Sequence, residues 1–320
     1  MTIWNGGHIM SDFVMIADAN CALDKEHRQE LGVVDYVRSQ ITFPDGKTHD
    51  TDLDWTEISA DDYYRSMKED KAIYKTGVPS IDAVAEVYDK YLADGKDILT
   101  ITLSSRMSST YNVFMQARKQ CLEKYPDRKI SVVDSLRFST PIAMMYMEAS
   151  RMQKEGKSLE EITDWLEANK NCYHQMGPMD DMMFLARTGR ITGFKAFFGN
   201  MVGVNAMGDY LPTGIAEILT KVKGRKAAFA VTLEYVKRTI VDTDTILIGH
   251  TLKAEEAENY KKAIEEEFHP KHIEIIRVDM SCGANVGPGM VGVYYKGKPA
   301  TEGLEEEKKI MEEIVADLKK

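Results

Sequence analysis

The sequence has few of the features that mark a disulfide scaffold, a metal centre or a membrane protein. Its four cysteines lie far apart, and none belongs to a Cys-x-x-Cys pair. We therefore expect neither a disulfide framework nor a zinc site. We expect instead that the thiols are reduced and that the protein is cytoplasmic. No run of 18 apolar residues occurs that would form a membrane-spanning helix. The N-terminal sequence has neither the basic nor the apolar region of a signal peptide, so we expect none.

Clustered positive charge is also scarce. The chain contains 41 lysines and arginines against 51 aspartates and glutamates, which gives a formal net charge of -10. Its densest basic stretch, residues 221–226, is short. An acidic chain without a basic stripe repels phosphate backbones and anionic lipid surfaces. We expect no nucleic-acid partner and no stable membrane insertion.

Standard catalytic signatures are missing as well. The sequence contains no G-x-S-x-G elbow, no Walker A loop and no H-E-x-x-H motif. A formal G-x-G-x-x-G occurs at Gly287, Gly289 and Gly292. A dinucleotide fingerprint must open a helix, whereas residues 291–295 read as a strand and Pro288 removes an N–H donor. We predict that this segment forms a tight hairpin that lines a cleft. For the chain as a whole, we predict that it binds no cofactor and has no enzymatic activity on its own.

Short apolar runs that alternate with helical sequence predict an α/β fold. These runs occupy residues 13–17, 98–103, 130–133 and 245–249, and helix-like sequence follows the last three at 108–122, 140–155 and 253–268. Apolar runs of this length are typical of strands buried on both faces, and strand–helix alternation is typical of a doubly wound sheet. We predict a parallel sheet with helices on both faces.

At 320 residues the chain is long for one compact core, so two lobes sharing a cleft are expected. Beyond about residue 170, short apolar stretches carry turn signals, as at 206–210. We predict an N-terminal α/β domain over residues 11–170 and a C-terminal α+β domain over residues 171–300, with the ligand cleft between them. Residues 301–320 are highly charged with spaced apolar side chains, which predicts an amphipathic C-terminal helix that packs on the body.

Four serines and a threonine gather within residues 103–111, where a predicted strand turns into a helix. The start of a helix offers unpaired N–H groups and a partial positive charge, and ligands of open α/β sheets lie outside the carboxyl ends of the strands. A single hydroxyl of Ser105 or Ser108 would be enough to cap the helix. Five hydroxyls exceed that need, so we predict that Ser104, Ser105 and Ser108 contact an anionic head group.

Other parts of the sequence carry weaker signals. Residues 76–80 place a hydroxyl at a second loop-to-helix junction, although a Pro-Ser helix start explains it more readily. Arg187 or Arg190 can pair with a carboxylate or phosphate, and an ordinary ion pair explains them equally well. Asp18 and Asp134 end predicted strands, where they can act on a proton or a metal, but aspartates at this position more often cap turns.

Six segments, taken in order along nearly the whole chain, resemble the motifs of the DegV family, the fatty-acid-binding proteins of bacterial fatty acid kinase systems. The segments are Ile16–Ala19 (I-T-D-S in the family), Thr76–Ser80 (T-S-Q-P-S), Leu103–Tyr111 (S-S-x-L-S-G-T-Y), Val132–Ser135 (V-x-D-S), Phe184–Thr192 (Y-L-x-x-G-G-R-I-S) and Asn285–Gly289 (H-x-G-P-G). Each match alone is weak, but six in the same order identify the chain as similar to this family.

The resemblance implies a lipid carrier rather than an enzyme. It implies one long-chain fatty acid, bound with its carboxylate at the lobe interface and its tail in the second lobe. It also implies a partner kinase subunit that phosphorylates this carboxylate to an acyl phosphate. The head contacts carry over onto Thr76, onto the serines between 104 and 108 with Ser108 first, and onto Asn285.

The chain departs from the family motifs at these head contacts. Asn285 stands where the family has histidine, so a cationic partner for the carboxylate is lost, and Arg106 stands where glycine is usual. Polar family residues are also replaced at Ala17, Ala19, Gly77 and Val78. We hypothesise that Arg106 supplies the missing charge.

The tail and the head group of such a ligand are expected to contribute differently to its binding. A tail of roughly 14 methylenes contributes on the order of 11 kcal/mol, at about 0.8 kcal/mol per CH₂, whereas a hydrogen bond to a charged head adds about 1.5–3 kcal/mol. The tail should set affinity and the hydroxyls should set orientation. Two alternatives stay open: a carrier of another small anion, with a short second-lobe pocket, and a hydrolase or phosphotransferase that uses Ser108 or Asp134.

Overall fold

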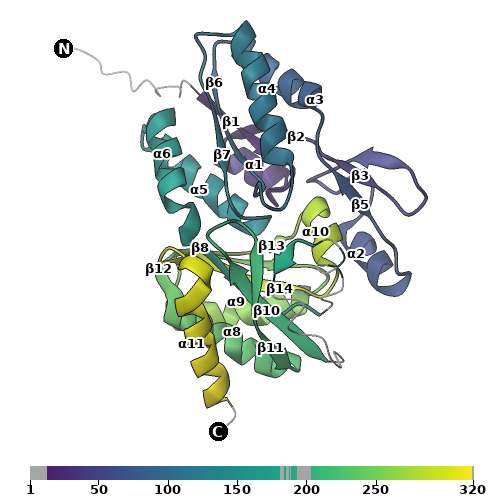
Figure 1. Ribbon diagram of the computed structural model, residues 1–320, viewed down its shortest axis with the longest axis vertical. Coiled ribbons are helices and arrows are strands. Elements are labelled where there is room, and N and C mark those ends of the chain that lie inside the picture. Colours follow the sequence, from purple (N-terminus) through teal and green to yellow (C-terminus); the bar gives the residue numbers. More distant parts are fainter. Residues whose placement is uncertain (1–12, 181–183, 185–186, 188, 193–202, 319–320) are drawn as a thin grey trace, which may run out of the picture.

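A computed structural model describes residues 13–180, 184, 187, 189–192 and 203–318 (Figure 1). The apolar helix that the sequence predicts around Phe194, Phe197, Phe198 and Met201 lies outside these ranges. Among the described helices, none is both long enough and apolar enough to cross a membrane.

The N-terminal half of the chain forms a four-stranded parallel sheet. Its strands are β1 (Phe13–Asp18), β2 (Val33–Val37), β6 (Asp97–Thr102) and β7 (Ile130–Asp134), in the order β2-β1-β6-β7. Its helices are α1 (Lys25–Leu31), α3 (Ile81–Ala93), α4 (Thr110–Lys124), α5 (Thr140–Lys154) and α6 (Leu159–Asn169). Ile16 and Ile98 pack with α3 and α4 on one face, while Met15 and Leu99 pack with α5 and α6 on the other. The predicted α/β fold with helices on both faces is confirmed.

A small antiparallel sheet projects from the side of this parallel sheet (Figure 1). It consists of β3 (Gln40–Thr42), β4 (Thr48–Asp50) and β5 (Lys75–Gly77) in the order β4-β3-β5, accompanied by helix α2 (Ala60–Glu69). The buried Tyr63 hydroxyl donates to the Met280 carbonyl at 3.0 Å, and the buried Tyr64 hydroxyl donates to the Val278 carbonyl at 2.8 Å. These bonds hold the side sheet, and with it β5, against the C-terminal half of the chain.

The C-terminal half contains two further sheets. A mixed sheet has the order β13-β12-β14-β8, made of β8 (Tyr173–Met176), β12 (Ile240–His250), β13 (His272–Arg277) and β14 (Val291–Gly297). A second sheet has the order β10-β11-β9, made of β9 (Ile191–Thr192), β10 (Val204–Tyr210) and β11 (Ala216–Lys223). The helical elements are η1 (Lys170–Cys172), α8 (Arg225–Thr239), α9 (Ala254–Phe268), α10 (Met280–Val286), η3 (Glu302–Leu304) and α11 (Glu305–Asp317).

Two predictions about the C-terminal half are corrected by this topology. The apolar run at 245–249 does not join the parallel sheet of the N-terminal half, because it lies in β12, which pairs parallel with β13 and antiparallel with β14. A strand buried on both faces gives the same apolar run in either kind of sheet. Residues 206–210 form the end of β10 and not a turn. Gly208 lies there because a Cβ would stand only 2.2 Å from the Glu217 carbonyl oxygen.

The predicted hairpin at the glycine-rich segment is also wrong. Asp279 caps a short helix, α10, by accepting a hydrogen bond from the Cys282 N–H at 2.9 Å. The helix ends at Gly287, whose φ of +77° favours glycine. The strand predicted from Val291 follows as β14. The glycines thus link a helix to a strand, which is the reverse of the order that a dinucleotide fingerprint requires.

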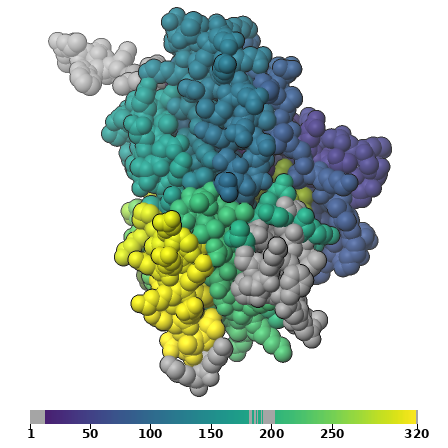
Figure 2. Space-filling view, in the orientation of Figure 1, coloured from purple at the N-terminus to yellow at the C-terminus, as the bar shows by residue number. Residues whose placement is uncertain are grey.

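The two halves share hydrophobic packing. One cluster of buried side chains includes both Met15 of β1 and Tyr294 of β14. Helix α11 (yellow in Figure 2) lies along the C-terminal half, where Met311 and Ile314 are buried in a cluster with side chains of α8 and β11. The domain boundary near residue 170 stays a prediction, because the packing is continuous across it.

An ion-pair cluster joins α1 of the N-terminal half to β13 of the C-terminal half. His27 contacts Glu274 through Nε2 at 2.8 Å and Asp24 through Nδ1 at 2.7 Å, and His272 contacts Glu274 at 3.4 Å. The hydrogen bond to Glu274 raises the pKa of His27 to about 9. The same bond lowers the pKa of Glu274 to about 2.

The free energy of unfolding is expected to fall as the pH rises from about 6.5 to about 9. Folding raises the pKa of His27, so the pair contributes its full stability below pH 6.5 and loses it as the pH passes 9. Partial exposure limits the loss to about 1–2 kcal/mol. Urea unfolding at a series of pH values measures it. His27→Gln should flatten this slope, and His49→Gln, in an exposed pair with Glu57, should leave it unchanged. An equal slope in wild type and His27→Gln would refute the assignment.

Candidate functional site

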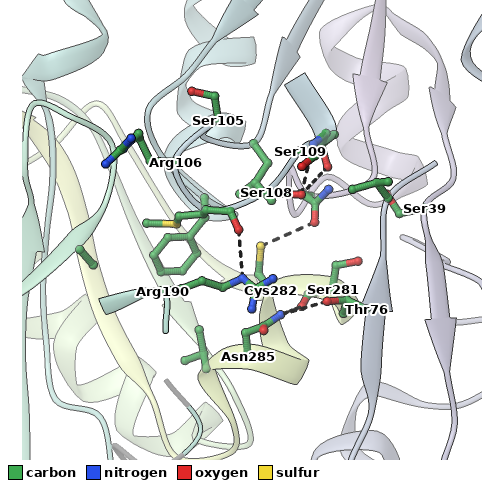
Figure 3. Close-up of a pocket in the computed structure, with 18 of the residues that line it drawn as sticks. Ser39, Thr76, Ser105, Arg106, Ser108, Ser109, Arg190, Ser281, Cys282 and Asn285 are labelled. Atoms are coloured by element: carbon green, nitrogen blue, oxygen red, sulfur yellow. Dashed lines mark hydrogen bonds between the residues drawn. The ribbon is translucent and has the colours of Figure 1, made fainter. Parts of the chain in front are cut away.

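A cavity of about 400 Å³ lies between the two halves of the molecule. Its lining contains both polar and apolar residues. The polar lining comprises Asn20, Ser39, Thr76, Ser105, Arg106, Ser108, Ser109, Thr110, Gln175, Arg190, Ser281 and Asn285. The apolar lining comprises Val78, Leu103, Met107, Phe138, Met179, Ala216, Cys282 and Val286, and Gly77 and Gly208 complete it. Figure 3 shows most of these side chains around the cavity.

The serine-rich turn lies at the carboxyl end of β6, as predicted, but its hydroxyls have different surroundings. Ser104 is fully buried, and its Oγ donates to the Gly214 carbonyl at 2.5 Å. Gly214 has a φ of +91°, and a Cβ there would stand 2.5 Å from Ser104 Oγ. The Ser104 hydroxyl therefore faces the β10–β11 turn and does not line the cavity.

Ser105 and Ser108 both line the cavity. The Ser105 N–H donates to Asp134 at 3.1 Å, which fixes the start of the turn. Ser108 Oγ lies 2.8 Å from Thr110 Oγ1 and accepts a hydrogen bond from the Thr110 N–H at 3.2 Å. Helix α4 begins at Thr110, and its N-cap residue Ser109 makes no side-chain cap bond. The cluster thus holds more hydroxyls than the helix start uses.

Thr76 and Asn285 meet at the cavity although 209 residues separate them in the sequence. Asn285 Nδ2 donates to Thr76 Oγ1 at 3.4 Å and to the Ser281 carbonyl at 2.9 Å. Thr76 comes from β5 of the small side sheet, and Asn285 comes from α10. The pairing of β5 with β3 and the packing of α2 against α10 bring these two side chains together.

Two arginines border the cavity. Arg106 is exposed, and in Figure 3 its guanidinium points away from Thr76 and Asn285. Arg190 is partly buried, its Nε donates to the Met107 carbonyl at 3.0 Å, and its side chain extends toward Cys282 and Asn285 (Figure 3). The positive charge beside Asn285 is therefore that of Arg190, and Arg106 lies at the rim.

The two strand-end aspartates hold loops in place. Asp18 is fully buried and accepts hydrogen bonds from the Leu103 N–H at 2.9 Å and from the Asn20 side chain at 2.6 Å. Burial raises the pKa of Asp18 to about 6. Asp134 accepts from the N–H groups of Ser105 and Leu136. Within the described parts of the chain, no group of three histidine, cysteine, aspartate or glutamate side chains is placed to hold a metal ion.

Sequence reasoning missed several residues that line the cavity, chiefly Ser39, Gln175, Phe138 and Ser281. Ser281 lies one helical turn before Asn285, so a helix at this segment would have placed both on one face. Because the segment was predicted to be a hairpin, Ser281 was not recognised as lying on the same face as Asn285. Ser39 precedes a three-residue strand in a side sheet for which the sequence carried no recognised signal.

The profile of the DegV family, described as a family of uncharacterised proteins, matches residues 12–298 of the chain. A DegV domain-containing protein of Clostridium perfringens is 30% identical over 290 residues, which cover 90% of this chain and 98% of that protein. The match to the family profile extends over the two halves of the molecule and over every residue that lines the cavity.

Solved structures of similar fold include lipid-binding proteins. A DegV lipid-binding protein from Thermotoga maritima has a TM-score of 0.78 and 21% identity, covering 91% of this chain and 99% of its own. The fatty acid kinase B3 protein of Streptococcus pneumoniae, solved with linoleic acid, has a TM-score of 0.76 and 20% identity, covering 90% of this chain and 100% of its own. At these identities the likeness shows the fold alone.

Proposed function

The chain belongs to the DegV family, and from that premise we propose that it binds one long-chain fatty acid in the cavity between its two halves. The observation that carries the proposal is the composition of that cavity, whose lining combines hydroxyl, amide and guanidinium groups with apolar side chains. A ligand with a charged head and a hydrocarbon tail matches both kinds of lining. Relatives of the same fold bound to fatty acids support this reading.

In this proposal the carboxylate lies beside Thr76, Ser105, Ser108 and Asn285. A buried carboxylate without hydrogen bonds is strongly unfavourable, so the donors fix where the head can lie. Arg190 supplies the positive charge in place of Arg106, because its side chain extends toward Asn285. An arginine presents planar, fork-shaped donors that suit a carboxylate.

The hydrocarbon tail lies against the apolar lining, which includes Phe138 and Met179. Methionine adapts to an irregular alkyl chain because it is unbranched and polarisable. Burial of the tail provides most of the affinity at about 0.8 kcal/mol per CH₂. The hydroxyls then fix the orientation of the acid in the cavity.

The protein would act in the cytoplasm as a carrier and not as an enzyme. It would present the carboxylate to a partner kinase, which phosphorylates it to an acyl phosphate. The cavity reaches the surface beside the head residues, since Arg106 and Ser109 are exposed and line it. A relative of the same fold is a fatty acid kinase B protein, and this supports the assignment of a kinase partner.

Extraction of the purified protein tests the proposal directly. Organic extraction and mass spectrometry should recover a long-chain carboxylic acid at about one molecule per chain. Recovery of no such acid, together with no binding of added hexadecanoic acid by the stripped protein, would refute the proposal. Conversion of the ligand by the chain alone, abolished by Ser108→Ala, would favour an enzyme instead.

Arg190→Gln is expected to weaken hexadecanoic acid binding by about 10- to 100-fold, since a hydrogen bond to a charged group contributes about 1.5–3 kcal/mol. Arg106→Gln is the matched control and should change affinity less than about threefold, because an exposed charge at the rim is screened. Calorimetric titration of delipidated protein measures both. Arg190→Lys, which keeps the charge, should recover part of the loss. Equal effects at both arginines would contradict the placement of the charge.

A further inference from the structure

A second cavity, of about 200 Å³, lies between helix α2 and the C-terminal half of the chain. Its walls come from the end of α2, from the chain after β8, from the residues just before α9 and from the chain after α10. Figure 1 shows α2 next to α10. This cavity shares no lining residue with the first one, so the two are separate spaces.

Positive charge concentrates in the second cavity, although the chain as a whole has a formal net charge of -10. The cationic side chains that line it are Lys68, Lys71, Arg187 and Lys253. Among the described residues of its lining, Asp180 is the only acid, and it already pairs with Arg225 at 2.8 Å and with Lys253 at 3.4 Å. Like charges repel one another, so their convergence on one hollow creates a positive potential that favours an anion.

Two of these four cations lack a counter-charge. The Lys71 ammonium donates to the Lys68 carbonyl at 2.8 Å, which closes the end of α2. Lys253 pairs with Asp180, as described above. Neither Lys68 nor Arg187 forms a salt bridge within the part of the chain that the structure describes. Their charges are therefore the ones that a ligand can neutralise without displacing an ion pair of the protein.

The orientation of Arg187 depends on a buried aromatic ring. Its guanidinium carbon lies 4.4 Å from the centroid of the Phe184 ring. Phe184 is buried, and its ring packs so closely on Gly287 that a Cβ there would stand 2.4 Å from it. A guanidinium above an aromatic face keeps its N–H donors, which lie at its edge, free to bind. Phe184 thus holds Arg187 in place and leaves its donors available.

The size and lining of the cavity indicate the class of anion. About 200 Å³ is less than the roughly 300–1,000 Å³ that drug-sized ligands occupy, so the ligand is small. Arginine binds phosphate through two parallel N–H bonds, and lysine binds it as a point charge. A phosphomonoester carries a charge of about -1.5 to -2 at pH 7 and three acceptor oxygens, so it can contact both unpaired cations at once. The apolar lining, which includes Met67 and Phe184, suits a small organic group.

We propose that the second cavity is a ligand site that binds the phosphate group of a small phosphomonoester. Arg187 and Lys68 donate to the phosphate oxygens, Lys253 adds positive charge beside them, and the organic group lies against Phe184. The site is separate from the fatty-acid cavity, although the chain at the end of α10 contributes to both. Asn285 lines the first cavity and Pro288 lines the second.

Calorimetric titration of the protein with phenyl phosphate tests the site. Benzoate has the same ring with a carboxylate in place of the phosphate, and it should bind at least about 10-fold more weakly. Arg187→Gln should weaken phenyl phosphate binding by about 10-fold or more, and Lys68→Gln by about fivefold. The matched control is Arg65→Gln, since Arg65 is an exposed residue of α2 that pairs with Asp62 and lines neither cavity. This variant should change the affinity less than about threefold.

Several results would overturn the phosphate site. They are unchanged affinity in both variants, equal affinity of wild type for phenyl phosphate and benzoate, or no saturable binding of phenyl phosphate. Tighter binding of inorganic phosphate than of phenyl phosphate would assign the cavity to the free ion. Binding to vesicles of phosphatidylcholine and phosphatidic acid, without binding of phenyl phosphate, would assign the cations to a lipid surface.

Two further measurements locate the ligand. Loss of phenyl phosphate binding in Arg190→Gln, with wild-type affinity in Lys68→Gln, would place the anion in the first cavity and refute the second. The melting temperatures of Arg187→Gln and Lys68→Gln without ligand should equal that of wild type, because both replaced side chains are exposed. A loss of affinity at an unchanged melting temperature then reports on binding and not on folding.

Discussion

Asp209→Ala is expected to lower the free energy of unfolding by about 3–5 kcal/mol, the loss typical when one partner of a buried ion pair is removed. Asp209 of β10 is fully buried. Its carboxylate contacts His174 Nδ1 at 2.7 Å, and accepts from the Gln175 N–H at 3.0 Å, the Tyr210 N–H at 2.8 Å and the Tyr235 hydroxyl at 3.1 Å. The substitution leaves all these groups without their acceptor.

The charges of this pair depend on each other. Burial opposes ionisation of Asp209, but His174 and the surrounding donors outweigh burial and lower its pKa. Burial likewise opposes protonation of His174, but Asp209 outweighs it and raises the pKa of the imidazole. The second ring nitrogen of His174 lies 2.7 Å from the Lys298 carbonyl, so both nitrogens are engaged. Loss of Asp209 thus leaves a buried imidazole with no counter-charge within hydrogen-bond reach.

Denaturant unfolding at pH 7 measures the effect. Asp244→Ala provides a control, because Asp244 forms an exposed pair with Lys271 at 2.8 Å and should change stability by less than about 1 kcal/mol. Asp209→Asn keeps the shape and removes the charge, so it should fall between wild type and Asp209→Ala. A loss below about 1 kcal/mol for Asp209→Ala would show that the pair does not support the fold.

Ala216→Phe is expected to weaken fatty-acid binding by at least about 100-fold. Ala216 is buried on β11 and lines the cavity. A ring in a cavity of about 400 Å³ occupies space that the tail would need. Exclusion of roughly four methylenes removes about 3 kcal/mol, which corresponds to more than 100-fold in affinity.

The copurified acid and its affinity are the two measurements. Ala216→Ser keeps the side-chain volume and should retain the ligand. The melting temperature of stripped Ala216→Phe should stay close to that of stripped wild type, because the ring enters existing space and does not overpack a filled core. Wild-type affinity in Ala216→Phe would place the tail elsewhere in the molecule.

The sequence predicted those parts of the molecule that local patterning determines. The helical sequence at 140–155 became α5, and the apolar runs at 13–17, 98–103 and 130–133 became β1, β6 and β7. The parallel sheet places the serine-rich turn at the carboxyl end of β6, where the prediction put it. Such features depend on residues within a few positions of each other, so a single sequence carries them.

Local patterning carries no information where the arrangement depends on distant residues. The Ser104 hydroxyl is used by Gly214, which lies 110 residues away. Arg190, not Arg106, extends toward Asn285, because the Met107 carbonyl holds its Nε. Helix α10 is seven residues long and contains glycine, so it has little helical periodicity. The only sequence signal for its start is the N-cap residue Asp279. No periodicity of one segment encodes contacts of these kinds.

The tyrosine hydroxyls of α2 have a mechanical consequence for the site. Tyr63 and Tyr64 join α2 to the backbone on either side of Asp279, and Gly283 leaves room for the Tyr64 ring, since a Cβ there would stand 2.1 Å from its hydroxyl oxygen. Movement of the side sheet away from α10 would break both buried hydrogen bonds, that of the Tyr63 hydroxyl and that of the Tyr64 hydroxyl, at the same time. The fold therefore sets the distance between Thr76 and Asn285 before a ligand binds. A ligand must fit this distance, because the protein does not adjust it on binding.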